Sequence, residues 1–268
     1  MPKYNYEQIK VVKKRSRRSK LIKSFLVVVF LGGFVFFFAD VFSSVITVGT
    51  FSFSVFESVE EINYKPKSLF ALSIGKYNSK DEADEVANVA GSWGAGGYVV
   101  HLDNSYFVIG SIYSTKDDSE KVRESLQLTN YNTETIELNF NKLNFKIESL
   151  AKSDKMKIKV CLDFLREIYN RIYDVSIKID KSEITNVAGS SFLNTLKSEV
   201  KIQNMNLNKL NLSYSNEKLY KLCNTLTQVE DSLDSCVNQL LENSYINRAI
   251  KYTMCEIVFL EYNLLNNL

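Results

Sequence analysis

The chain has 268 residues, of which 45% are hydrophobic and 24% charged, an ordinary composition for a folded protein. Its net charge of +2 conceals an asymmetry, because residues 1–23 carry nine Lys or Arg against one Glu, and the remaining residues sum to −6. A nucleic-acid-binding protein would carry its basic patch on the folded part, so this distribution argues against a nucleic-acid partner and favours a membrane surface beside residues 1–23.

An apolar segment over residues 24–48 follows, with Asp40 as its single charge. As a helix it would reach about 37 Å, which exceeds the roughly 30 Å thickness of a hydrocarbon core. We therefore expect a basic cytoplasmic tail over 1–23 and a transmembrane helix over 24–48, with the lipid bilayer as a partner. A cleaved signal peptide is the alternative, but its apolar region would be shorter and would end in small residues.

This topology predicts a single-pass protein of the cell membrane, with a cytoplasmic N-terminus and an extracytoplasmic C-terminus. Residues 49–67 are expected to form a linker, because their polarity is mixed and Pro66 disfavours helix at the residue before it. A small domain then follows over 68–142, and a helical part over 143–268.

The small domain begins with a predicted strand over Phe70–Ile74, where apolar residues alternate with smaller ones. Asn78 or Ser79 can cap the next helix, whose first turns are acidic and suit the positive end of the helix dipole. Gly91 ends that helix, and the GAGG sequence at 94–97 forms the next turn.

The second half of the domain repeats this order. Strands are predicted over Tyr98–Leu102 and Tyr106–Tyr113, joined by a tight hairpin turn at Asp103–Asn104. A helix begins at Lys116, and alternation over Glu134–Phe140 indicates a fourth strand. The predicted fold class is α+β: a βαββαβ domain with a four-stranded antiparallel sheet and two helices on one face, small but able to fold alone.

These residues resemble the SPOR domain, a peptidoglycan-binding module of bacterial cell-division and sporulation proteins. The first half of the family pattern is matched by Phe70, Leu72, Ile74, Gly75, Tyr77, Ser79 and Ala83. The second half is similar at Tyr106, Val108, Gly110, Tyr113 and Thr115, with one extra residue between Gly110 and Tyr113. The chain departs from the pattern at Ser73, where the family usually has Gln, and at Lys76, where it has Ser.

The resemblance implies that glycan strands lacking stem peptides bind to the sheet face opposite the helices. Alternation along the predicted strands places six residues there, namely Ala71, Ser73, Val99, His101, Phe107 and Ile109. A face this apolar is not an idle surface, so either it binds a ligand or the C-terminal segment covers it.

Candidate glycan-binding residues follow from the need for an aromatic platform with polar groups beside it. They are Ser73, Tyr77, Asn78, His101 and Phe107. Each also has a structural explanation, since a tyrosine such as Tyr77 commonly packs at the edge of a core and His101 can simply face solvent.

Catalytic signals are missing from the sequence. With a single histidine no Ser-His-Asp arrangement can be argued, and no Cys/His spacing typical of zinc is present. The GAGG sequence precedes a strand, which is the wrong context for a phosphate-binding loop. We expect no enzyme activity, no metal and no cofactor.

From about residue 144 the apolar period changes to that of helices, which predicts a bundle of three or four helices over 143–268. Its four cysteines are Cys161, Cys223, Cys236 and Cys255. Outside the cytoplasm they could form two disulfides, or they could be buried thiols, and both interpretations stay open. The bundle itself is typical of a module that binds a protein partner.

Two functions are compatible with these features. In the first, a membrane-anchored SPOR-like protein binds peptidoglycan glycan strands without catalysis at division or sporulation septa. In the second, the SPOR-like fold binds no glycan, and the chain is a scaffold whose C-terminal helices dock a protein partner.

Overall fold

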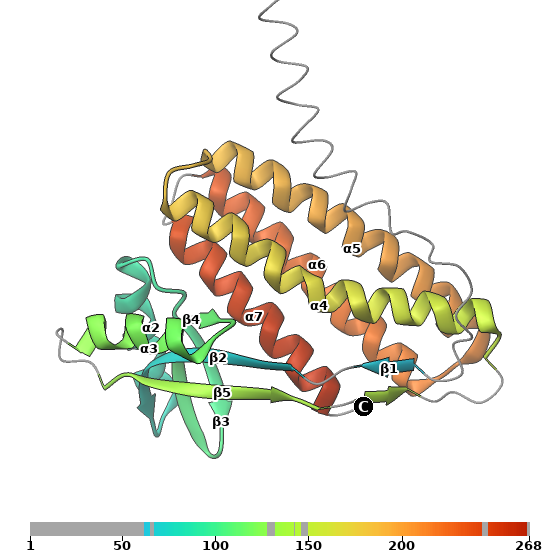
Figure 1. Ribbon diagram of the computed structural model, residues 1–268, viewed down its shortest axis with the longest axis horizontal. Helices are drawn as coiled ribbons and strands as arrows, with labels where there is room; N and C mark the ends of the chain where they lie inside the picture. The colour runs from blue at the N-terminus through green and yellow to red at the C-terminus, as the bar shows by residue number, and fades with distance from the viewer. Residues whose placement is uncertain are drawn as a thin grey trace, which may run out of the picture. The chain divides into compact units, whose positions relative to one another are not determined.

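The computed structural model describes residues 62–64, 67–127, 132–141, 143–145, 150–242 and 246–266 (Figure 1). In chain order its elements are β1 (Ile62–Tyr64), β2 (Lys67–Tyr77), α2 (Lys80–Ser92), β3 (Tyr98–Leu102), β4 (Ser105–Tyr113), α3 (Lys116–Gln127), β5 (Glu134–Phe140), β6 (Leu143–Phe145), α4 (Lys152–Asp180), α5 (Asn186–Tyr214), α6 (Glu217–Leu241) and α7 (Ile246–Asn266). The four-stranded antiparallel sheet and the C-terminal helices that the sequence predicted are therefore confirmed.

The four-stranded sheet has the order β3-β4-β2-β5, and every neighbouring pair is antiparallel. The pairing of β2 with β4 shifts twice, between Leu72 and Ser73 and again between Ser73 and Gly75. In the first shift Gly110 is the additional residue of β4, and in the second Ile74 is the additional residue of β2. The extra residue of the family pattern, between Gly110 and Tyr113, lies directly after the first of these bulges.

Helices α2 and α3 pack on one face of this sheet, as predicted. Small residues of α2 let it approach closely, since Ala83, Ala87 and Ala90 are buried against Ile74 and Val108. On α3 the buried Ser119 hydroxyl lies 3.0 Å from the Thr135 hydroxyl of β5. Ser79 caps α2 by accepting a hydrogen bond from the Glu82 amide.

Four long helices, α4 to α7, form the C-terminal part, each with an apolar side turned into a shared core. Helix α5 extends from 186 to 214, because Thr185 caps its start and Ser215 ends it in a left-handed conformation. All four cysteines are buried and free. Burial raises the pKa of Cys223 and of Cys236 to about 11, so these side chains are protonated thiols at neutral pH.

A second, two-stranded sheet pairs β1 with β6, which the sequence did not predict. Each strand has three residues, too few for an alternating pattern to stand out. Ile62 is buried, so the end of the predicted linker belongs to the folded part of the chain.

The predicted membrane anchor is not supported. Residues 24–48 lie outside the described residues, and no described helix is long and apolar enough to cross a bilayer. The predicted transmembrane helix over 24–48, the predicted single-pass membrane localisation and the bilayer as a partner are therefore not supported by the part of the chain that the structure describes.

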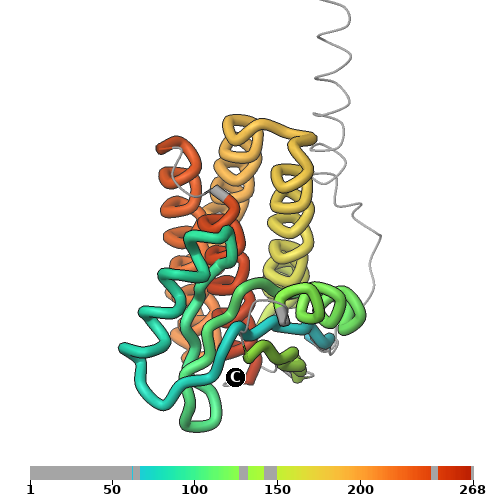
Figure 2. The backbone as a smooth tube through the Cα atoms, turned by 90° about the vertical axis from the view of Figure 1, so that its left-hand side faces the viewer, coloured from blue at the N-terminus to red at the C-terminus, as the bar shows by residue number. Residues whose placement is uncertain are grey.

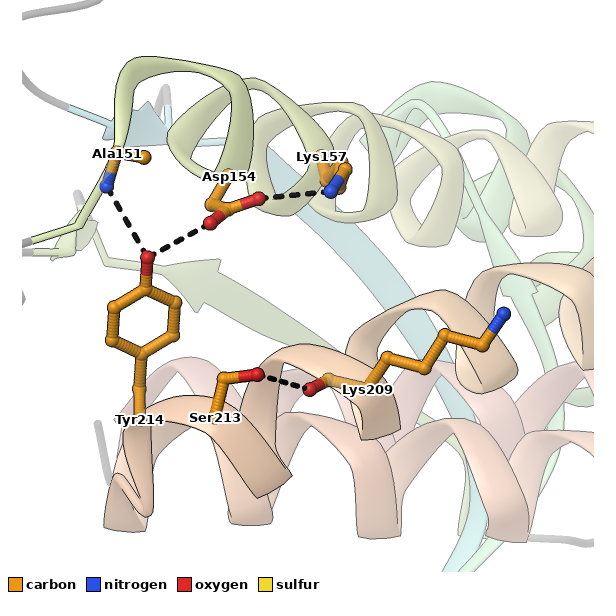
Figure 3. Close-up of polar contacts among 6 residues, drawn as sticks. All are labelled: Ala151, Asp154, Lys157, Lys209, Ser213 and Tyr214. Carbon is orange, nitrogen blue, oxygen red and sulfur yellow. Dashed lines mark hydrogen bonds and ion pairs between the residues drawn. The ribbon is translucent and has the colours of Figure 1, made fainter.

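The start of α4 is stabilised by a side chain from α5 (Figure 3). The residue before α4 is Ala151, which has no side-chain oxygen to cap the helix. The Tyr214 hydroxyl takes that role by accepting from the Ala151 amide at 3.4 Å and donating to Asp154 at 2.8 Å. Hydrogen bonds from Lys157 and then from Tyr214 hold the pKa of Asp154 below its ordinary value.

We predict that Tyr214→Phe lowers the free energy of unfolding by about 1 kcal/mol, because two hydrogen bonds are lost while the ring stays. Urea denaturation at pH 7 measures this. Since Asp154 has a lowered pKa in the folded state, its share of the difference should disappear as the pH falls through that pKa. Tyr220→Phe, at an exposed tyrosine of α6, is the control and should be neutral. Equal stability of the two variants would contradict the capping role.

Candidate functional site

Helix α7 covers the face of the sheet that α2 and α3 leave open (Figure 2). It packs against β3, β4 and β5 of the four-stranded sheet. Near its start, Tyr252 meets the Tyr98 ring of β3 edge-on with ring centroids 5.3 Å apart, and Phe259 stacks on the same ring at 5.6 Å. At the other edge Tyr262 meets Phe140 of β5 at 5.6 Å. The sheet and the helical bundle therefore share one continuous core.

Two of the candidate glycan-binding residues lie under this helix layer. Phe107 is 7% exposed and belongs to the same buried cluster as α7, and the Lys76 ammonium sits 5.3 Å from its ring centre. Ser73 is fully buried, and its hydroxyl donates to the Gly75 carbonyl at 3.1 Å within the bulge. Neither side chain can reach a ligand in this structure. Of the two possibilities for the apolar face, coverage by the C-terminal segment is the one observed.

A buried ion pair joins α7 to β2. Lys67 donates to Glu261 at 2.8 Å, and the Glu261 side chain is only 1% exposed. Burial lowers the pKa of Lys67, and the Glu261 carboxylate partly offsets this by favouring the charged form. The ammonium also lies 4.6 Å from the centre of the Phe140 ring. Because the two charges are buried, a shift of α7 along the sheet would separate them. The ion pair therefore holds the helix in one position.

The other three candidate residues gather at one end of the sheet, where α2 begins. Tyr77 is paired with Tyr106 across β2 and β4, and Tyr106 is paired with His101 across β4 and β3. The His101 and Tyr106 rings lie 4.7 Å apart. Asn78 follows Tyr77 directly and is exposed, as is His101. We call Tyr77, Asn78, Tyr106 and His101 the sheet-end cluster.

The sheet-end cluster lies on the α2 side of the sheet, not on the α7 side. Tyr77, Tyr106 and Val99 pack against the α2 core, so His101 and Val99 share a face with the helices rather than with Phe107. The hairpin explains this placement. Asp103 and Asn104 both have positive φ, as a two-residue turn requires, and Leu102 therefore pairs with Ser105 and His101 with Tyr106.

Sequence reasoning missed Tyr106 as a member of this cluster. The signal was present, since a two-residue turn at Asp103–Asn104 determines which residues of the two strands lie opposite each other. Counting outward from the turn would have paired His101 with Tyr106 and separated both from Phe107.

No group of three or more His, Cys, Asp or Glu side chains able to hold a metal is found within the described ranges. The absence of enzyme activity stays a prediction, because nothing in the structure tests it.

Comparison with known proteins gives one result. No family model and no curated protein matches the chain. Among solved structures, part of the chain is similar to the solution structure of the peptidoglycan binding domain of the B. subtilis cell wall lytic enzyme CwlC. The match has 23% sequence identity, covers 28% of this chain and 94% of that one, and has a TM-score of 0.25. That neighbour is a peptidoglycan-binding domain, but a TM-score this low assigns no family to the chain.

We predict that Lys67→Met lowers the free energy of unfolding by about 3 kcal/mol, because it leaves the Glu261 carboxylate buried without the Lys67 ammonium. The double variant Lys67→Met/Glu261→Leu should recover most of the loss, since the charge is removed together with its counter-charge. Chemical denaturation of both variants provides the measurement.

Lys121→Met is the matched control, because Lys121 pairs with Asp117 on the exposed side of α3. Such a surface pair contributes less than about 1 kcal/mol. A loss for Lys67→Met no larger than for this control would show that α7 is not held by the ion pair.

Proposed function

We propose that this chain binds peptidoglycan glycan strands without catalysing a reaction, and that it does so through the sheet-end cluster instead of the sheet face. The observation that carries the proposal is the cross-strand row of Tyr77, Tyr106 and His101 beside the exposed Asn78. This row lies on the α2 side of the sheet, away from the face that α7 covers.

The chemistry of the sheet-end cluster suits a sugar chain. Aromatic rings offer flat apolar surfaces to the C–H faces of sugar rings, while their edges carry polar atoms. The Asn78 amide both donates and accepts, as hydroxyl and acetamido groups require, and the His101 imidazole adds a donor or an acceptor.

The ligand class comes from the resemblance to SPOR domains, whose pattern residues occupy β2, α2 and β4 in the expected order. Glycan strands without stem peptides are the ligand that this resemblance implies, and division or sporulation septa are the place where it implies binding. A non-catalytic role accords with the chain's single histidine.

We predict that the purified chain sediments with amidase-treated cell-wall sacculi, and that Asn78→Ala/His101→Ala weakens the affinity at least about fivefold. Two polar contacts of about 0.5–1.5 kcal/mol each account for this factor. Ser73→Ala is the matched control, because Ser73 lies on the covered face and should leave sedimentation unchanged.

The whole folded unit is needed for this assay, since residues 68–142 alone would expose the apolar face that α7 covers. If the double variant sediments as the wild type does, the sheet-end cluster does not bind the glycan. No sedimentation of the wild-type chain would refute glycan binding.

A scaffold that docks a protein partner is the second candidate, and the outer side of α5 favours it. Val187, Ile202, Met205 and Leu212 are all exposed there. Two of the charges of α5 are engaged within the bundle, Lys197 with Asp234 and Glu199 with Arg171. Several exposed apolar side chains along one side of a helix are typical of a protein interface. A folded chain that fails to bind treated sacculi would favour this function.

A further inference from the structure

Helices α5 and α6, which pack side by side in the bundle, carry most of the exposed apolar side chains (Figure 1). Of the nine large apolar side chains that are exposed within the described ranges, six lie on these two helices. They are Val187, Ile202, Met205 and Leu212 of α5, and Tyr220 and Leu241 of α6. At 3.6 residues per turn, the four of α5 fall on one side of that helix. A concentration of exposed apolar groups indicates an interaction surface, which we call the α5–α6 face.

Charges of opposite sign lie on the two halves of the α5–α6 face. A surface depression between the helices is lined by Lys197, Ser198 and Lys201 of α5, and by Glu230, Asp231 and Asp234 of α6. Lys197 pairs with Asp234 at 2.5 Å, but the other three charged side chains form no ion pair within the described part of the chain. The acidic residue of α5, Glu199, is engaged with Arg171 of α4. The face is therefore basic along α5 and acidic along α6.

The alignment of α5 with α6 places these groups at matching levels along the bundle. Two side-chain contacts define it, Lys197 with Asp234 at 2.5 Å and Asn204 with Thr227 at 2.8 Å. The two helices are therefore antiparallel, since a step of seven residues forward on α5 is a step of seven residues back on α6. The same count places Lys201 level with Glu230, and Leu212 within one residue of Tyr220.

We propose that the α5–α6 face joins two copies of this chain in a symmetric dimer, with α5 of each copy lying over α6 of the other. A twofold axis parallel to the helices produces this arrangement and keeps every residue at its own level. Lys201 then faces Glu230 and Asp231 of the second copy, and Leu212 faces its Tyr220. An axis perpendicular to the helices would lay α5 on α5 and set like charges against each other. The face is thus complementary in charge to itself in one orientation.

The size of the α5–α6 face suits a stable dimer. Helices of 29 and 25 residues are about 40 Å long, and two of them side by side are about 20 Å wide. About 800 Å² per copy would be covered, which is the size of a standard protein interface. The dimer does not depend on glycan binding. It gives the exposed side of α5, which the second candidate function leaves to another protein, a second copy as its occupant.

Sedimentation velocity of the purified whole chain tests the dimer. We expect dimers at micromolar concentration, with an affinity that falls as salt is raised. Lys201→Glu and the double variant Glu230→Lys/Asp231→Lys should each raise the dissociation constant at least about tenfold, because each replaces attraction by repulsion at both symmetry-related contacts. An equimolar mixture of the two variants should dimerise again, because each supplies the charge that the other needs. Lys121→Glu reverses an exposed lysine of α3 and should dimerise as the wild type does.

A wild-type chain that stays monomeric, or a Lys201→Glu variant that dimerises as strongly as the wild type, would overturn the dimer. Two weakened variants that do not recover on mixing would contradict the placement of α5 over α6. Recovery on mixing supports that placement and shows that both variants are folded. Binding of the wild type to sacculi is measured separately, so the failure of the dimer and the failure of glycan binding are distinguishable.

Discussion

The packing of α7 across the sheet is the interaction on which the rest of the folded unit depends. A four-stranded sheet with helices on one side leaves its second apolar face to be buried, and here the last helix of the chain buries it. The contacts join residues far apart in sequence, such as Lys67 with Glu261 and Phe140 with Tyr262. Because the core runs through the sheet into the bundle, the two parts stabilise each other.

Because α7 covers this face of the sheet, the residues that resemble the SPOR pattern need a structural interpretation. Most of them serve the fold, since Ser79 caps α2, Ala83 allows its close approach and Gly110 forms a bulge of β4. The position where the family usually has Gln is occupied by Ser73, whose short side chain bonds to the bulge beneath α7 and leaves no polar group reaching outward. A longer amide there would have to be buried against an apolar helix, at a cost unless it found partners. The departure from the family pattern and the covered face are therefore consistent with each other.

The sequence correctly predicted the features that depend on residues close together in the chain. Strands β3 and β5 were predicted to the residue, because alternation and the Asp103–Asn104 turn are short-range signals. The stripe along α7 showed that this helix is buried on one side, but a stripe does not say against what, so its position on the sheet was not predictable. The pairing of β1 with β6 was not predicted for the same reason, because strands of three residues separated by the whole small domain show no alternating pattern. For the candidate site, the residue types were recognised but their division between two faces was not.

The Lys67–Glu261 pair also determines what happens at the far end of α7. An apolar stripe alone would tolerate a shift of the helix by one turn, because similar side chains recur at that spacing. A buried carboxylate does not, since it must stay beside its ammonium. Helix α7 is thereby held in one register, and Arg248, about 20 Å away along the helix at 1.5 Å per residue, is placed over Gly91 of α2. This register brings α7 close to Gly91, over which the Arg248 side chain lies, and to Gly96, which lies against the backbone of Lys251 and Tyr252. The ion pair with β2 near one end of α7 and the packing of Arg248 over α2 near the other are two consequences of a single helix position.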